Sequence, residues 1–332
     1  MCATNFDKTF LINNFTTLLF RSLGWIILGL IFSFLVNNIL VLSLNYPNFY
    51  SIFIEYNSDS FIILGIYILG VILPISFVIL SPSNTLRFDA EMLHKFNVYF
   101  IRSCFWAVIF VGLTDFFISF MRVERILPIL LNDYFVRALG RSAFVGLYIH
   151  VPLILLGFVV SLYTRTLGFT WLALIIVAGE LLIVISRFVF SYEQSFMGDL
   201  VRYWYAALFL FASAYTLYQN GHVRVDVFYA SMSTKARGAV NAFGSILLGA
   251  STCIVIILIG FDGKQSIINS PIMNFEITQT GTVGMFIKYQ MAAFLGIFGI
   301  SMLIQFISYF FESIADYRNE VGHRDHQTSV IS

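Results

Sequence analysis

Charged residues are scarce in this chain. Asp, Glu, Lys and Arg together make up 11% of its 332 residues, whereas hydrophobic residues make up 59%. Soluble domains contain about a quarter charged residues, so this chain has too few to cover a water-soluble surface. The mean hydropathy of +0.86 therefore indicates a protein of the lipid bilayer. The net charge of +1, without a basic tract, gives no electrostatic reason to expect nucleic-acid binding.

Cysteine is also sparse, since the chain contains only Cys2, Cys104 and Cys253. An odd number without metal-ligand spacing argues against a disulfide framework and against a zinc site. The sequence also lacks His-x-x-x-His and Glu-x-x-x-His pairs, a Gly-x-Ser-x-Gly turn and a phosphate-binding glycine loop. We therefore expect no catalytic residue, no metal and no cofactor. A secretory signal is not expected either, because the first apolar run, residues 23–44, is too long for one.

Long apolar runs are what the sequence does contain. About twenty apolar residues in a helix cross a hydrocarbon core of roughly 30 Å. We therefore predict an all-α polytopic membrane protein with about eight transmembrane helices, in two groups of four that meet near residues 164–168. The predicted spans are residues 23–44, 61–81, 98–121, 142–163, 169–190, 203–219, 239–260 and 288–310.

Three of the connections between these spans are amphipathic. Residues 46–56 repeat aromatic side chains at three- and four-residue spacing without a Lys or Arg, and residues 128–140 separate an apolar face from a polar one. Residues 83–97 show a weaker form of the same pattern. We expect these segments to be interfacial helices that lie in the membrane surface.

The distribution of Lys and Arg indicates the orientation. With the N-terminus in the cytoplasm, the inner side has a small excess of these residues, and the Arg-free loop at residues 45–60 lies outside. The arginines of residues 122–141 oppose this assignment. We predict that both termini are cytoplasmic.

Three ionisable residues, Asp115, His150 and Glu180, lie inside predicted spans. A charge at the centre of a membrane helix costs about 2.5 to 3.5 kcal/mol on insertion scales, so Glu180 should face protein. Arg187 follows it by two turns on the same face. His150 precedes Pro152, where a kink could expose backbone carbonyls. These residues either pack helices together or serve an autonomous ion or solute carrier, or a membrane enzyme.

Small residues recur in the seventh and eighth spans. Ser245, Gly249 and Cys253 follow one another at four-residue spacing, as do Ala292 and Gly296. Such stripes let membrane helices approach closely, which favours compact helix packing over a pore. The seventh span is preceded by several polar residues, among which Ser233 is the predicted N-cap.

Residues 219–229, QNGHVRVDVFY, concentrate three ionisable side chains in this weakly charged sequence. His222, Arg224 and Asp226 alternate with valines. Strict alternation is typical of an extended segment, whereas a helical turn would place His222 beside Asp226. A solvated turn explains the charges, but it explains neither the valines nor Asp226.

This motif and its surroundings resemble the small membrane subunit, the DctQ-like family, of tripartite ATP-independent periplasmic (TRAP) transporters. The matching residues are Ala214, Tyr215, Gly221, His222, Val223, Arg224, Val225, Asp226, Phe228, Tyr229, Ser233 and Arg237. SRFVF, with Arg187, is similar to the end of the family's first helix. FMGDLVRYWYA, with Asp199 and Arg202, is similar to the opening of its second. The resemblance covers residues 169–318.

The resemblance implies a non-catalytic small permease subunit that braces a large elevator-type membrane subunit during sodium-coupled uptake. The solute, usually a carboxylate, would be delivered by a periplasmic solute-binding protein. It further implies a multi-pass protein of the bacterial inner membrane, in contact with lipids. We expect an additional N-terminal membrane region at residues 1–166, a DctQ-like region at 167–320 and a cytoplasmic tail at 321–332. On this interpretation His222, Arg224 and Asp226 form a cytoplasmic clamp, and Arg187, Asp199, Arg202, Gly221 and Arg237 are structural or interface residues.

Overall fold

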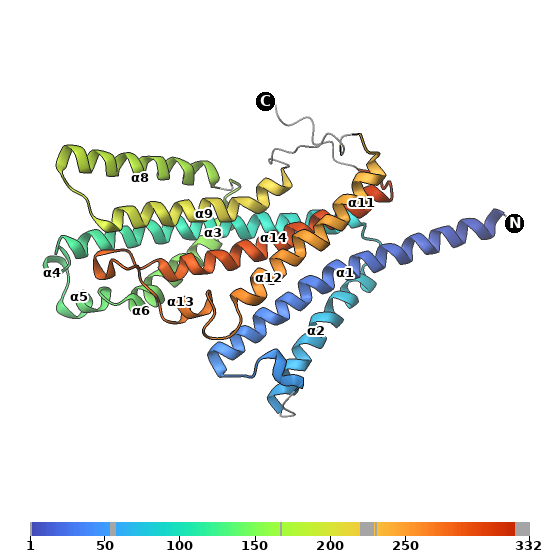
Figure 1. The fold of residues 1–332 in the computed structure, drawn as a ribbon, viewed down its shortest axis with the longest axis horizontal. Coiled ribbons are helices and arrows are strands. Elements are labelled where there is room, and N and C mark those ends of the chain that lie inside the picture. Colours follow the sequence, from blue (N-terminus) through green and yellow to red (C-terminus); the bar gives the residue numbers. More distant parts are fainter. Residues whose placement is uncertain (1, 54–57, 167, 220–228, 230, 323–332) are drawn as a thin grey trace. The chain divides into compact units, whose positions relative to one another are not determined.

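The computed structural model describes residues 2–53, 58–166, 168–219, 229 and 231–322. The described residues form helices, turns and loops with no strand among them, as the all-α prediction requires (Figure 1). The elements are, in chain order, α1 (Cys2–Leu44), η1 (Phe49–Phe53), α2 (Ser58–Leu80), α3 (Leu86–Val123), α4 (Leu127–Leu130), α5 (Asp133–Leu139), α6 (Ser142–Val145), η2 (Gly146–His150), α7 (Val151–Tyr163), α8 (Phe169–Phe190), α9 (Ser195–Tyr218), α11 (Thr234–Gly244), η3 (Ser245–Ala250), α12 (Ser251–Gly260), α13 (Asn269–Met273), η4 (Gly281–Val283) and α14 (Lys288–Tyr317).

Among the described residues, seven helical segments are long and apolar enough to cross a membrane. They are residues 15–44, 58–80, 86–123, 142–163, 169–190, 234–260 and 288–317. Six of the eight predicted spans fall within these segments, and a seventh, residues 61–81, extends one residue beyond its segment. The remaining one, residues 203–219, corresponds to α9. This helix forms, but Arg202 and its several Tyr and Trp residues lower its hydropathy below that of a typical span.

The amphipathic connections differ in part from their predictions. Residues 86–97 are not a separate surface helix, because α3 continues without interruption to Val123. No Pro or Gly stands near residues 95–98 to end it. Residues 128–140 form two short helices, α4 and α5, and the side chain of Asn132 caps the second by accepting a hydrogen bond from the amide of Phe135. In residues 46–56, the structure describes a 3-10 turn at Phe49–Phe53.

The chain divides into two compact units. Unit 1 comprises residues 1–95, 216–264 and 302–332, and unit 2 comprises residues 96–215 and 265–301. Each unit therefore combines segments from the N-terminal half with segments from the C-terminal half. Three long helices, α3, α9 and α14, contribute to both.

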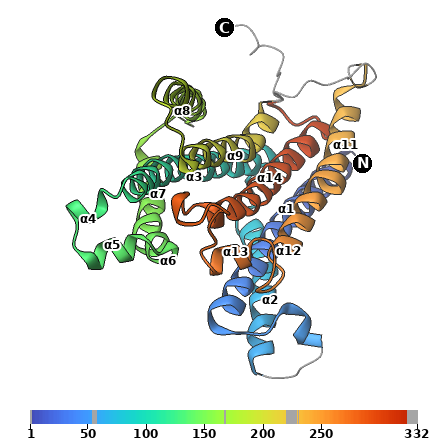
Figure 2. The same cartoon turned by 60° about the vertical axis from the view of Figure 1, so that its left-hand side comes forward.

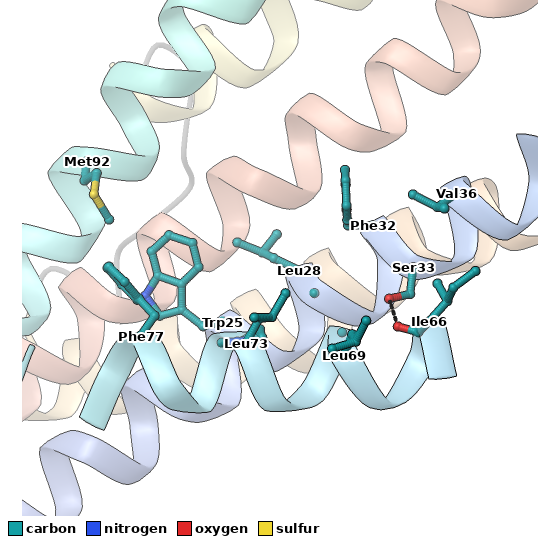
Figure 3. Close-up of a pocket in the computed structure, with 13 residues that line it drawn as sticks. Trp25, Leu28, Phe32, Ser33, Val36, Ile66, Leu69, Leu73, Phe77 and Met92 are labelled. Atoms are coloured by element: carbon teal, nitrogen blue, oxygen red, sulfur yellow. Dashed lines mark hydrogen bonds between the residues drawn. The ribbon is translucent and has the colours of Figure 1, made fainter. Parts of the chain in front are cut away.

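In unit 1, α1 and α2 form a tightly packed hairpin. A Cβ on Gly29 would lie 2.2 Å from the Gly70 carbonyl oxygen, so only glycine permits this approach. Ser33 donates a hydrogen bond to the Ile66 carbonyl at 2.9 Å (Figure 3). An almost wholly apolar groove of about 710 Å³ runs along this hairpin, with Trp25 and Phe77 among its lining residues.

The predicted small-residue stripe of the seventh span also lies in unit 1. Ser245, Gly249 and Cys253 are all buried. A Cβ on Gly249 would lie 2.4 Å from the Phe306 ring of α14. The stripe is therefore a close-packing face, as its spacing predicts. Ser233 caps α11 by accepting a hydrogen bond from the amide of Ala236 at 3.3 Å.

Unit 2 is built on α3, with α7 and α9 packed against it, and α3 and α9 lie side by side in both views (Figures 1 and 2). A Cβ on Gly157 of α7 would lie 2.6 Å from the backbone nitrogen of Ala107 in α3. Ser103 and Ser161 share a hydrogen bond of 2.6 Å between the same two helices. The rings of Phe105 and Phe211 meet edge to face between α3 and α9. These contacts place the polar groups described next in a closely packed interior.

Candidate functional site

The main polar cluster of unit 2 centres on Asp115, which lies in α3 and is fully buried. Its Oδ2 atom accepts a hydrogen bond from the backbone amide of Phe286 at 2.7 Å. Its Oδ1 atom faces Nε2 of His150 at 3.4 Å. Both side chains are fully buried, so the two intramembrane residues that the sequence singles out here form one site.

A chain of hydrogen bonds begins at the other ring nitrogen of His150. Its Nδ1 atom and the hydroxyl of Tyr289 are 2.8 Å apart. The amide group of Gln290 donates to the Tyr289 hydroxyl at 3.0 Å, and Tyr203 of α9 donates to Oε1 of Gln290. The cluster therefore ties α3, α7, α9 and α14 together in unit 2.

The backbone positions His150 by means of a π-helical turn at Gly146–His150. Pro152 lies two residues after His150, and a proline cannot donate the backbone hydrogen bond that its position in a regular helix needs. A wider turn relieves this conflict, and such turns are frequent at functional positions. The predicted irregularity before Pro152 is thus a π turn that directs His150 into the cluster.

A second buried carboxylate, Asp199, holds the neighbouring backbone amide. Its Oδ2 atom accepts hydrogen bonds from the amide of Met285 at 3.1 Å and from the hydroxyl of Thr278 at 3.4 Å. Arg202 approaches its Oδ1 atom to 3.9 Å, but the Arg202 side chain is 78% exposed. Asp199 and Asp115 therefore bind consecutive amides of the segment that precedes α14, residues 274–287, which we call the pre-α14 segment.

Arg122 binds the carbonyl groups of the same segment. It donates to the carbonyls of Thr282 and Gly284, each at 2.7 Å, and to that of Leu139 at 3.3 Å. Its guanidinium group also lies 4.0 Å from the centroid of the Phe286 ring. From the sequence, Arg122 is only one of the loop cations that oppose the predicted orientation. Backbone carbonyls leave no mark in a sequence, so no pattern could have identified this role.

Unit 1 has its own buried ion pair, which the sequence analysis also missed. Arg21 of α1 is fully buried and its Nε atom lies 2.7 Å from Oδ2 of Asp89 in α3. Arg21 also donates to the carbonyl and the hydroxyl of Ser81, and Trp25 donates to Asp89 at 2.9 Å. Nearby, Arg87 forms a second ion pair with Asp316 of α14 at 2.7 Å.

The C-terminal end of α8 and the turn after it contain a further group of charged and polar contacts. Arg187 is 60% exposed and its Nε atom lies 3.3 Å from Oε2 of Glu193. In the same turn Tyr192 donates a hydrogen bond to Oε1 of Glu124 at 2.6 Å. Partial burial and the adjacent Glu124 carboxylate raise the pKa of Tyr192 to about 12.

The other predicted residues do not join these clusters. Glu180 lies in the middle of α8 and is exposed, and no hydrogen bond or ion pair in the described residues joins it to Asp115 or His150. Arg237 donates to the Met232 carbonyl at 2.9 Å and its guanidinium group lies over the Tyr229 ring. The core of the predicted clamp, Gly221, His222, Arg224 and Asp226, lies outside the described residues.

The chemistry of these clusters is that of structural anchoring. Within the part of the chain that the structure describes, no group of three or more His, Cys, Asp or Glu side chains is arranged to hold a metal ion. The carboxylates of Asp115 and Asp199 instead bind backbone amides, which must be paired when they are removed from water. The Asp89 carboxylate binds the side chains of Arg21 and Trp25.

Comparison with protein families identifies part of the chain. Residues 170–316 match the family described as tripartite ATP-independent periplasmic transporters, DctQ component. The chain has no match among the curated proteins or the solved structures with which it was compared. The matched region begins with α8 and ends in α14, which confirms the resemblance predicted over residues 169–318. Residues 170–316 therefore form a DctQ-family domain, and additional helices precede it in this chain.

Proposed function

We propose that this protein is a non-catalytic scaffold that braces the large elevator-type subunit of a TRAP transporter. In this role it supports sodium-coupled uptake of a carboxylate-type solute, which a periplasmic solute-binding protein delivers. An elevator mechanism needs a membrane body that stays still while the transport domain moves. The proposal therefore requires the small component to be rigid.

The observation that best supports this function is the fixation of the pre-α14 segment. Asp115 and Asp199 bind its consecutive amides, and Arg122 binds two of its carbonyls. Met285 and Phe286 are buried, and buried backbone outside a regular helix is stable only when other groups pair with its amides and carbonyls. Here charged side chains satisfy them, and charge-assisted hydrogen bonds are about twice as strong as neutral ones. Such a segment is suited to a static support.

The proposal extends to the arrangement in the cell. The chain lies in the bacterial inner membrane with both termini in the cytoplasm, and the motif of His222, Arg224 and Asp226 grips the inner rim of the complex. Arg187, Arg202 and Arg237 also contribute to contacts with the large subunit, because each carries an exposed or partly exposed cation.

Reconstitution in liposomes tests the function. The chain alone should not transport carboxylates or sodium ions, and saturable uptake should appear when the large subunit, the binding protein and a sodium gradient are all supplied. Omitting the chain should abolish uptake. Saturable flux by the chain alone, lost in Glu180→Gln, would instead identify an autonomous carrier.

A further inference from the structure

Glu180 occupies an unusual position on α8. This helix is a candidate membrane span of 22 residues. At 1.5 Å per residue, Glu180 lies about 15 Å from either end of the helix. Its side chain is exposed. A carboxylate therefore stands on the outside of this chain at the depth of the hydrocarbon core.

Three acidic residues in or beside the other predicted spans have different surroundings. Asp89, Asp115 and Asp199 are buried, and each accepts hydrogen bonds from side chains or backbone amides. Glu180 has no hydrogen bond or ion pair within the described residues. Arg187, two turns further along the same face, pairs with Glu193 instead.

Lipid is an unfavourable environment for this side chain. A carboxylate at the bilayer centre costs about 2.5 to 3.5 kcal/mol on insertion scales. A glutamate side chain is too short to reach the interface from this depth, whereas Arg187, near the helix end, can do so. We therefore expect protein, not lipid, to cover the face of α8 that carries Glu180.

The residues around Glu180 suit a helix contact. Val177 and Val184 lie one turn before and one turn after it on the same face, and they are 66% and 49% exposed. Leu172 and Ile176 of the same helix are buried, and Gly179 lies close to Val201 of α9. The helix thus has one face packed in unit 2 and a second face, lined by valines around one carboxylate, that the unit leaves open.

We propose that the surface formed by Val177, Glu180 and Val184 docks a membrane-spanning helix of the large TRAP subunit, which presents a cation or a hydrogen-bond donor to Glu180. This inference rests on the proposed function. A second copy of the chain fits less well, because a two-fold contact centred on this surface would oppose two Glu180 carboxylates. A partner with the complementary charge satisfies Glu180 and excludes lipid from it.

The test compares two measurements on the same variants. The full chain is co-expressed with the large subunit, and their dissociation constant is measured in lipid nanodiscs. Glu180→Leu should weaken the complex roughly tenfold, since it leaves the buried partner group unpaired. Glu180→Gln keeps an acceptor oxygen and should weaken it less. In the isolated chain, Glu180→Leu should leave the thermal midpoint unchanged or raise it, because it removes a carboxylate from lipid.

Matched controls separate the possible failures. Leu162→Ala alters an exposed apolar position on α7 and should leave the affinity unchanged. If the wild-type chain does not bind the large subunit, the proposed function fails. If the wild type binds and Glu180→Leu binds equally well, only the present inference fails.

Two further results would identify a different partner for Glu180. A lower thermal midpoint for Glu180→Leu in the isolated chain would place the partner of Glu180 within the chain itself. Disulfide formation between two Val184→Cys chains would indicate a second copy; either result overturns the proposal.

Discussion

Asp115 and Asp199 accept hydrogen bonds from the consecutive amides of Phe286 and Met285, although they lie 84 residues apart in the chain. Neither amide can bond within α14, which begins at Lys288. An unpaired buried amide costs about 1 to 3 kcal/mol, so each carboxylate removes a penalty of this size. The two carboxylates therefore fix the position of the backbone directly before α14.

The two carboxylates should act as one unit. Asp115→Leu and Asp199→Leu should each lower the free energy of unfolding by about 2 kcal/mol, because each leaves one buried amide unpaired. The double variant should lose less than the sum, since either change releases the same segment. Denaturant titration in detergent measures these values. Asp133→Asn, an exposed acid on α5, is the control, and strictly additive losses would contradict the shared role.

Arg122 should not be replaceable by lysine. Its planar group donates to three carbonyls at once, and a lysine ammonium cannot reproduce that geometry. Arg122→Lys should lower the free energy of unfolding by about 1 to 2 kcal/mol and speed hydrogen exchange in the pre-α14 segment. Arg125→Lys, at an exposed neighbour, should change neither. Unaltered exchange in Arg122→Lys would show that the segment is held by other groups.

At this scale the sequence identifies residues better than it identifies their partners. Asp115 and His150 are conspicuous because ionisable groups are rare inside apolar runs, and Asp199 is found through the family pattern. Arg21 and Asp89 are separated by 68 residues, and nothing in the sequence links them. Arg122 binds mainly backbone carbonyls, and these leave no pattern in a sequence.

The sequence predicts where most of the long helices lie, but it does not predict their π turns or where α3 begins. Apolar runs define the spans because the bilayer thickness sets their length. The π turns at Gly146–His150 and Ser245–Ala250 cannot be located in this way, since one extra residue in a turn barely changes the hydropathy pattern. The continuity of α3 was missed because its polar first turns look like a separate surface helix.

The α1–α2 hairpin depends on one close backbone approach. Gly29→Ala would place a methyl group 2.2 Å from the Gly70 carbonyl oxygen, which the backbone cannot avoid without moving the helices apart. We expect a loss of about 1 to 3 kcal/mol in the free energy of unfolding. Gly65→Ala, on α2, meets no atom within 4 Å and should be neutral or slightly stabilising. Equal effects of the two changes on unfolding would refute this packing.

At the scale of the whole molecule, the weak charge asymmetry has a structural explanation. Several cations that oppose the predicted orientation are engaged in contacts of their own. Arg122 binds the pre-α14 segment, Arg187 pairs with Glu193 and Lys288 pairs with Glu276. These cations are placed by contacts within the fold. They therefore weaken the difference in Lys and Arg content between the two sides from which membrane orientation is inferred. The predicted orientation itself stays a prediction.

The additional N-terminal helices are part of the same cores as the DctQ region. In unit 1, Gly24 packs on Phe311, Arg87 pairs with Asp316, and Ser308 donates to the Ala90 carbonyl. In unit 2, the two carboxylates that hold the pre-α14 segment come from opposite sides of residue 166. Neither unit is complete without both halves of the chain.

This interdependence predicts the behaviour of the separated halves. Residues 167–332 expressed alone should be recovered as aggregate or with a markedly lower thermal midpoint, because buried groups such as Asp316 and the Phe286 amide lose their partners. Co-expression with residues 1–166 as a separate chain should restore a stable complex, since the cut falls in the connection between α7 and α8. Gel filtration and thermal unfolding in detergent report both outcomes. A stable, monodisperse 167–332 fragment would instead show that the N-terminal helices are not needed for folding. The contacts of Arg87 with Asp316 in α14 and of Asp115 with the pre-α14 segment would then contribute little to the fold.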